Sequence, residues 1–298
     1  MKKKHAGIVL ALLVICMALV FLSAAMNSGR GASASGLDAT PAADRTDELL
    51  RALEATVTED MALGECGAEE AAQLRALARE EPERARQLNF MAGHVDIYTL
   101  DAVKTALLGG DHIDFALELP FRAPDSSGLD ASVQLTAGQI PYMSQYDSRW
   151  AYHAYGSSVV GVTGCGPTCL AMVVAGLRGD ASVNPAKMAD FAGENGYYAA
   201  GTGTMWSLFT EGAARFGVSG TELPLDEGMM RSALATGDVI VASMLPGDFT
   251  QSGHFIVIYG AEGGGFRVHD PNSAERSAQL WSYDRLAGQI ANMWEMSA

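Results

Sequence analysis

The stretch that decides the fold is Gly164-Cys165-Gly166-Pro167-Thr168-Cys169-Leu170-Ala171-Met172-Val173-Val174. Its proline fits the first turn of a helix, where the missing N–H would have no partner anyway. The apolar run that follows predicts a helix from Cys165 to about Leu177, ending at Gly179. The thiol of Cys165 would then lie at the positive end of the helix dipole, among unpaired backbone N–H groups.

This position favours a nucleophilic role for Cys165. The helix start stabilises the thiolate, which is the reactive form of cysteine. The flanking Gly164 and Gly166 leave the thiol unshielded and let another backbone approach closely. A single cysteine is nevertheless more often a small apolar residue packed at a helix start, so the role depends on partners elsewhere. Cys169, one turn further on, is expected in the core.

Composition narrows the functional classes. The 298 residues are 48% apolar, which is enough for one large domain or two modest ones. Without the first 25 residues the chain carries 17 basic and 35 acidic side chains. This charge argues against nucleic acid and anionic membrane surfaces as partners. The sequence shows no CxxC pair, HExxH motif or calcium-type loop, so we expect no metal and no other cofactor.

The N-terminus predicts export. Three lysines within residues 1–5 precede an uncharged stretch from Ala6 to Leu22, and Ser23-Ala24-Ala25 follows. A basic start, an apolar run and small residues form an export signal, so residues 1–26 would engage the membrane or the export machinery. The apolar run is long for a signal peptide and short for a membrane span, so a cleaved signal and an N-terminal anchor both remain open. The protein is expected outside the cell or at its surface.

Cys16 lies in the predicted export signal, and the other three cysteines do not form a disulfide framework. Cys66, Cys165 and Cys169 are an odd number at irregular spacing. A bridge between Cys66 and Cys169 remains open at this point.

Periodicity divides the chain into segments. Residues 27–43 are small and polar, which is typical of a linker, and residues 44–122 predict short helices that form an N-terminal helical subdomain. The composition changes near residue 139. Between there and residue 298 helices come first and apolar strands follow, which predicts an α+β domain. The expected strands cover residues 239–242, 254–259, 266–270 and 289–294.

Two histidines could serve as the base, His254 and His269. Alternation along residues 266–270 places Asp270 on the inner face and His269 on the outer one. If the hairpin is centred on residue 262, His254 and Asp270 are cross-strand neighbours, whereas a slip of one or two residues favours Asn272. Together with Cys165, this pair would supply a thiolate, a base and an orienting carboxylate.

Gln145 could complete the site. Acyl transfer needs two hydrogen-bond donors at the developing oxyanion, and the backbone N–H of Cys165 is naturally one of them. A glutamine on a loop just upstream can supply the other.

Several motifs resemble family thirty-nine of the cysteine peptidases, the bacteriocin-processing group within the papain-like clan. The likeness is greatest to its stand-alone, exported bacterial branch and covers about Gln139 to Ala298. The motifs are Ile140-Pro141-Tyr142-Met143-Ser144-Gln145-Tyr146-Asp147, Gly164-Cys165-Gly166-Pro167-Thr168, Gly253-His254-Phe255-Ile256-Val257 and Val268-His269-Asp270-Pro271.

The resemblance implies a papain-like α+β fold, with a helical half and an antiparallel sheet behind a small all-α subdomain. It implies Gln145 as the oxyanion donor, Cys165 as the nucleophile, His254 as the base and Asp270 as the orienter. The upstream helices resemble the leader segment that such proteins carry. Bacteriocin-processing members sit on transporters, and this sequence carries no ATP-binding motif, so their double-glycine substrate is not expected here.

The sequence therefore predicts an exported thiol hydrolase that cleaves peptide bonds in peptide or protein substrates. Two alternatives remain open: a cell-wall amidase or peptidoglycan endopeptidase of the same fold, and a non-catalytic binding protein built on it. Peptides are favoured because five aromatic residues are expected to line an amphipathic groove. These residues are Tyr142, Tyr146, Trp150, Tyr152 and Trp206.

Overall fold

A computed structural model describes residues 42–126 and 128–298. The predicted signal or anchor, residues 1–26, and most of the predicted linker, residues 27–43, lie outside these ranges. Within the described ranges, no helix is long and apolar enough to span a bilayer. The chain divides into two compact units, Met1–Val57 and Thr58–Ala298. The domain boundaries that the sequence suggests within the second unit stay predictions.

The described part of the first unit is helix α2, Ala42–Glu54. The sequence predicts a helix that continues through Val57 to Gly64, and this prediction is wrong. The run Thr56-Val57-Thr58 contains only β-branched residues, which lose side-chain freedom in a helix. The Thr56 hydroxyl also donates a hydrogen bond of 2.7 Å to the Leu53 carbonyl, which occupies one of the carbonyls left free at the helix end.

The second unit begins with short helices. Their packing follows from buried apolar residues at helical spacing, such as Leu74, Leu88 and Phe115. The Thr99 hydroxyl caps α5 by accepting a hydrogen bond of 3.1 Å from the backbone N–H of Ala102. The helices are η2 (Glu59–Met61), α3 (Ala68–Glu80), α4 (Ala85–Gly93), η3 (Val95–Ile97), α5 (Leu100–Ala106), α6 (His112–Glu118) and η4 (Leu119–Phe121).

The decisive helix forms as predicted. Helix α8 is Cys165–Arg178, and Gly179 closes it with a left-handed φ of 66°. It is buried along most of its length, which fits a helix that is apolar on all sides. The neighbouring helical elements are α7 (Val160–Thr163), α9 (Pro185–Glu194), η5 (Trp206–Phe209) and α10 (Glu211–Ala214). The single helix expected over residues 206–216 is wrong, because this stretch forms the 3-10 helix η5 and the one-turn helix α10 on either side of Thr210.

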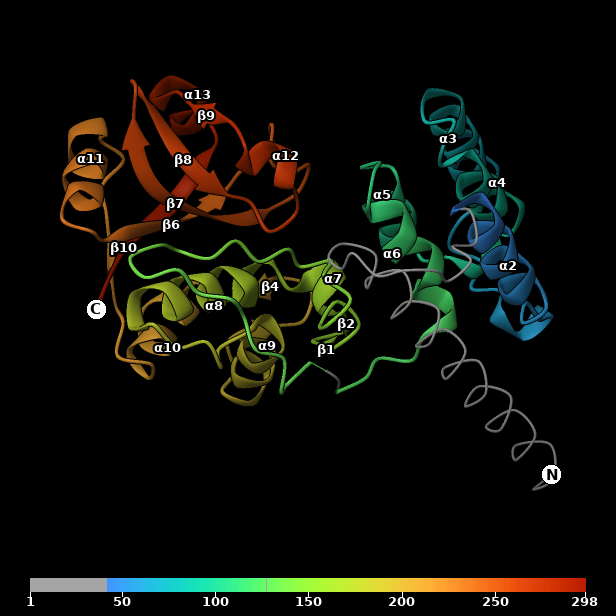
Figure 1. Cartoon of the computed structure of the whole chain (residues 1–298), viewed down its shortest axis with the longest axis horizontal. Helices are drawn as coiled ribbons and strands as arrows, with labels where there is room; N and C mark the ends of the chain where they lie inside the picture. Colours follow the sequence, from blue (N-terminus) through green and yellow to red (C-terminus); the bar gives the residue numbers. More distant parts are fainter. Residues whose placement is uncertain (1–41, 127) are drawn as a thin grey trace, which may run out of the picture. The chain divides into compact units, whose positions relative to one another are not determined.

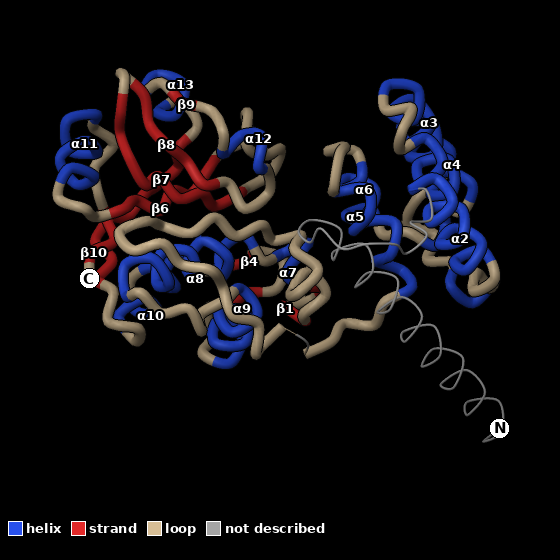
Figure 2. Tube along the Cα trace, in the orientation of Figure 1, coloured by secondary structure: helices blue, strands red, loops and turns tan. Residues whose placement is uncertain are grey.

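A six-stranded antiparallel sheet forms the other half, which confirms the α+β class. The strands are β5 (Ser219–Glu222), β6 (Val239–Met244), β7 (His254–Glu262), β8 (Gly265–His269), β9 (Leu280–Trp281) and β10 (Ile290–Ser297), in the order β5-β10-β6-β7-β8-β9. Two small hairpins, β1 (Ala154–Tyr155) with β2 (Ser158–Val159) and β3 (Tyr198–Ala199) with β4 (Gly203–Thr204), lie outside it. Figure 2 shows the strands of this sheet in red above the helices α8, α9 and α10.

Helices cover both faces of the sheet. Helix α8 packs on one face against Val241, Val257 and Trp294. Helix α11, Glu227–Ala235, packs on the opposite face, over Ile240 and Ile258. Figure 1 shows α8 beneath the sheet, on the side away from α11. Two further short helices, α12 (Ala274–Ser277) and α13 (Tyr283–Ala287), follow β8 and β9.

The β7–β8 hairpin has a register different from the predicted one. Val257 lies opposite His269 and Ile258 opposite Val268, and the register then shifts before residue 260. The turn is the pair Gly263-Gly264, both with positive φ, so the centre lies beyond residue 262. His254 is therefore not directly opposite Asp270. The two side chains meet diagonally at the open end of the hairpin.

Candidate active site

Cys165 is the first residue of α8 and is partly exposed. The flanking residue Gly166 allows a close approach, because a Cβ atom there would lie 2.6 Å from the Thr204 side chain. The helix start presents backbone N–H groups beside the thiol, as the sequence suggests.

His254 and Asp270 form a buried pair. Their Nε2 and Oδ1 atoms are 2.7 Å apart, and both side chains are almost fully excluded from solvent. Burial alone would lower the pKa of His254, but the Asp270 carboxylate and the Cys165 thiol raise it to about 9. The raised pKa favours the protonated form of the imidazole.

Asp270 is held by more than His254. The backbone N–H of Asn272 donates to its Oδ1 at 2.8 Å, and Arg276 Nε donates to its Oδ2 at 2.5 Å. Burial would raise the pKa of the Asp270 carboxyl, but His254 and Arg276 together lower it. Sequence reasoning missed Arg276. It lies on α12, whose N-cap is Ser273, and a short capped helix directly after Asp270 was the available signal.

Asn272, the residue that a slipped register would favour, also lies in the site. Its Nδ2 is 3.5 Å from Nδ1 of His254, which is the limit of a hydrogen bond. Its backbone carbonyl accepts a hydrogen bond of 2.6 Å from Nε2 of His112 on α6. The loop after Asp270 is thus tied both to the histidine and to an upstream helix.

Gln145 lies beside this loop. Its backbone N–H donates to the carbonyl of Pro271 at 3.0 Å, and its side-chain Nε2 donates to the carbonyl of Gly161 at 2.8 Å. The carbonyl acceptor fixes the orientation of the amide, because only the nitrogen can donate. The Oε1 atom is buried and has no hydrogen-bond partner within the described ranges. One N–H of the amide remains for another acceptor.

His269, expected on the outer face, is buried. Its ring stacks on Tyr259 with centroids 4.0 Å apart, and its Nε2 donates to the Ile140 carbonyl at 3.0 Å. Burial lowers its pKa. Alternation places His269 on the face of β8 opposite to Val268. The segment that begins at Ile140 covers this face, so His269 is buried rather than exposed.

The predicted aromatic groove is wrong in part. Trp150 and Tyr152 are buried, Trp150 in the main core and Tyr152 against Phe115. Tyr142 and Trp206 are exposed. The residue types suggested amphipathic surfaces, but aromatic rings are also what a large core requires.

Cys66, Cys165 and Cys169 are free thiols, so the bridge between Cys66 and Cys169 is not formed. Cys169 is fully buried, as expected. Within residues 42–126 and 128–298, no group of three or more histidine, cysteine or acidic side chains could hold a metal ion.

Of the comparisons with known proteins, the family model agrees with the motifs. A crystal structure from Bacillus anthracis, described as that of a provisionally assigned C39-like peptidase, matches at 15% identity with a TM-score of 0.33, over 57% of this chain and 99% of the other. No curated protein matches the chain. The family model of the Peptidase_C39 like family matches residues 138–298, more than half of the chain. The resemblance seen in the sequence is thus confirmed, and the chain belongs to the Peptidase_C39 like family.

Proposed function

We propose that the protein is an exported cysteine peptidase that uses Cys165, His254, Asp270 and Gln145. The observation that supports this most directly is the buried His254–Asp270 pair at 2.7 Å, whose histidine has its pKa raised partly by Cys165. A thiol, a base and an orienting carboxylate are the three groups that covalent acyl transfer requires. Family membership supports the peptide or protein substrate.

The reaction would proceed in two steps. The Cys165 sulfur bonds to the carbonyl carbon of the substrate, and the C–N bond then breaks as His254 gives its proton to the leaving amine. A water molecule next attacks the acyl-enzyme, passing one proton to His254. The S–C bond breaks, and the carboxylic acid leaves. Asp270 keeps the imidazole in one orientation throughout and stabilises its charged form.

The oxyanion would be held by two donors. One is the backbone N–H of Cys165 at the start of α8. The other is the second N–H of the Gln145 amide, since the first is bonded to the Gly161 carbonyl. That bond also fixes the amide before substrate arrives, which is what preorganised stabilisation requires.

Export is proposed from the N-terminal pattern of three lysines followed by an apolar run. Residues 1–26 would serve as a signal peptide or as an anchor in the membrane, and the peptidase would act outside the cell or at its surface.

The test is to incubate the protein with a mixed peptide library and, separately, with purified cell-wall sacculi, and to follow both by mass spectrometry. The Cys165→Ala variant is the blank. We expect Cys165-dependent cleavage of peptides. Release of wall fragments without peptide cleavage would assign the protein to the cell-wall hydrolases, and no reaction in either assay would favour a binding protein.

A further inference from the structure

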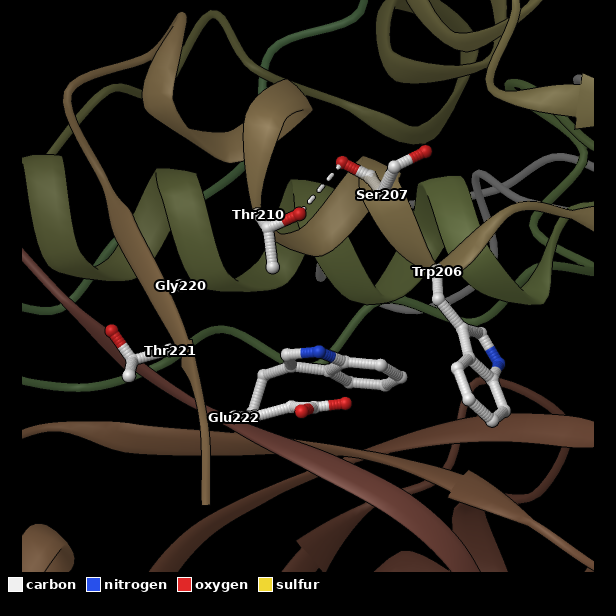
Figure 3. Close-up of a pocket in the computed structure, with 7 residues that line it drawn as sticks. Trp206, Ser207, Thr210, Gly220, Thr221 and Glu222 are labelled. Carbon is white, nitrogen blue, oxygen red and sulfur yellow. Dashed lines mark hydrogen bonds between the residues drawn. The ribbon is translucent and has the colours of Figure 1, made fainter.

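A surface pocket of about 460 Å³ lies between η5 and the strands β5 and β10. Two tryptophans and one carboxylate dominate its walls, Trp206, Trp294 and Glu222. Figure 3 shows the Glu222 carboxylate directed toward the side of the pocket where Trp206 lies. Neither the family match nor the proposed catalytic groups account for this pocket.

Its chemistry suits a cation. Trp206 is 48% exposed, an unusual fraction for the largest amphipathic side chain, and it meets Trp294 edge to face at 5.5 Å. Glu222 is exposed and accepts a hydrogen bond of 2.6 Å from Nδ2 of Asn292 through Oε1. No lysine or arginine is among the described residues that line the pocket. A lysine or arginine side chain from a ligand could therefore contact an indole face and a carboxylate together.

The pocket walls are fixed by backbone packing. A Cβ atom at Gly220 would lie 1.7 Å from the Phe209 carbonyl oxygen, so β5 and η5 touch backbone to backbone there. Phe209 in turn stacks on Trp294 with centroids 5.4 Å apart. Trp206, which opens η5, is held against this layer. The pocket walls therefore lose little conformational freedom when a ligand binds, and such preorganisation favours affinity.

The pocket is also within reach of Cys165. Thr204 packs against Gly166, the neighbour of Cys165, and Trp206 follows Thr204 by two residues. Two residues of extended chain span at most about 7 Å. An extended peptide advances about 3.3 Å per residue. A substrate whose scissile bond lies at Cys165 can thus place a side chain a few residues away in the pocket.

We propose that this pocket is a specificity subsite that takes the lysine or arginine side chain of a peptide substrate. The inference rests on the proposed peptidase function and adds to it the class of residue that the enzyme selects. Trp206 supplies the cation–π surface and Glu222 the opposite charge. The strongly acidic chain, at −15 overall, attracts basic peptides toward it.

The test compares matched peptides with the full chain. Peptides from the cleaved set are resynthesised with arginine replaced by citrulline, which has nearly the same shape without the charge. We expect kcat/KM to be about tenfold higher for arginine at one fixed distance from the scissile bond. Equal rates for the two peptides at every position would overturn the subsite.

Two variants and a control locate the preference. Glu222→Gln and Trp206→Leu should each reduce the ratio of arginine to citrulline rates to threefold or less. Glu69→Gln removes the same charge from an exposed position on α3 and should leave the ratio unchanged. If Glu222→Gln left the ratio of arginine to citrulline rates as unchanged as Glu69→Gln does, Glu222 would not belong to the subsite.

A binding measurement separates this inference from the proposed catalysis. The Cys165→Ala protein should bind the arginine peptide about tenfold more tightly than the citrulline peptide, whether or not the wild-type protein cleaves either. Failure to cleave with this preference intact would reject the peptidase and keep the subsite. Binding of N-acetylglucosamine oligomers with no preference for arginine would instead make the pocket a sugar site and overturn the inference.

Discussion

Asp270 contacts two basic side chains. One carboxylate oxygen faces His254 and the other faces Arg276, and the group is fully buried. A buried carboxylate needs such partners, because leaving it unpaired in the interior would cost several kcal/mol. The same two contacts fix the plane of the carboxylate. The orientation of His254 therefore depends on Arg276 as well as on Asp270.

Replacing Asp270 should impair activity less than removing the nucleophile. Asp270→Asn removes the charge that stabilises the imidazolium, but Asp270 itself forms no bond to the substrate in the proposed reaction. We therefore expect kcat/KM to fall roughly 10²- to 10⁴-fold. Cys165→Ala should reduce cleavage to the background rate. The measurement is steady-state cleavage of one library peptide. A harmless Asp270→Asn beside a damaging Asn272→Ala would make Asn272 the orienting residue.

Arg276 should set the acid limit of activity. It lowers the pKa of the Asp270 carboxyl, so the ion pairs stabilise the fold above the ordinary pKa of aspartate and are lost as the pH falls through the lowered value. In Arg276→Gln the carboxyl should take up its proton at higher pH, and the acid limb of the kcat/KM profile should move upward. Arg276→Lys should move it less.

The control for this profile is Arg231→Gln, which breaks a partly exposed pair with Glu227 on α11. It should leave the acid limb in place, since exposed pairs contribute little. An unmoved limb in Arg276→Gln would show that Asp270 does not govern it.

At the scale of elements, strong local signals predicted what the structure contains. The proline after Cys165 and the glycine at 179 bound α8, and both signals come from backbone chemistry that packing does not override. Strand β6 was found from its apolar, β-branched run, and β10 was expected over residues 289–294. Strand β5, Ser-Gly-Thr-Glu, was missed because its residues are polar and partly exposed at an edge of the sheet.

The candidate site was predicted in its residue types but not in its geometry. Asp270 lies near His254 because of the loop after β8, not because of the hairpin register that was used to pair them. The register shift before residue 260 is not visible in the sequence, since a bulge needs no special residue. Arg276 was missed because its contact with Asp270, six residues earlier, depends on how the chain turns between β8 and α12.

Gly220 tests the contact between β5 and η5. Gly220→Ala would place a methyl group 1.7 Å from the Phe209 carbonyl, so the strand must shift and the free energy of unfolding should fall by about 1–3 kcal/mol. Denaturant titration measures this. Gly93→Ala, where a Cβ meets nothing within 4 Å, is the matched control and should be neutral or stabilising. Equal stability in the two variants would contradict the close approach.

At the scale of the whole molecule, the upstream helix α6 contacts the segments that carry the site. Its Phe115 packs against Tyr146 and Tyr152, and a Cβ at Gly161 would meet the Phe115 ring at 2.3 Å. His112 of the same helix donates to the carbonyl of Asn272. This helix therefore belongs to the same folded unit as the site. If the upstream helices were removed as a leader segment, these contacts with the site would be lost.

Phe115→Ala should accordingly destabilise the protein and slow it. Removing a buried phenylalanine costs about 3–5 kcal/mol, and Phe115 packs against Tyr146, the neighbour of Gln145. Phe90→Ala, at a half-buried position on α4, is the control and should cost less. Thermal unfolding and peptide cleavage are measured on both. Full activity and stability in Phe115→Ala would show that the upstream helices are dispensable.

The central claim is that Cys165 is the nucleophile, and alkylation tests it most directly. The protein is treated with limiting iodoacetamide at pH 6, the modified cysteines are identified by mass spectrometry, and peptide cleavage is followed in the same samples. Cys66 and Cys169 are buried, and burial raises the pKa of both thiols, so they should react slowly. The account predicts that Cys165 is labelled first and that activity falls in proportion. Preferential labelling of Cys169, or full activity after Cys165 is alkylated, would contradict it.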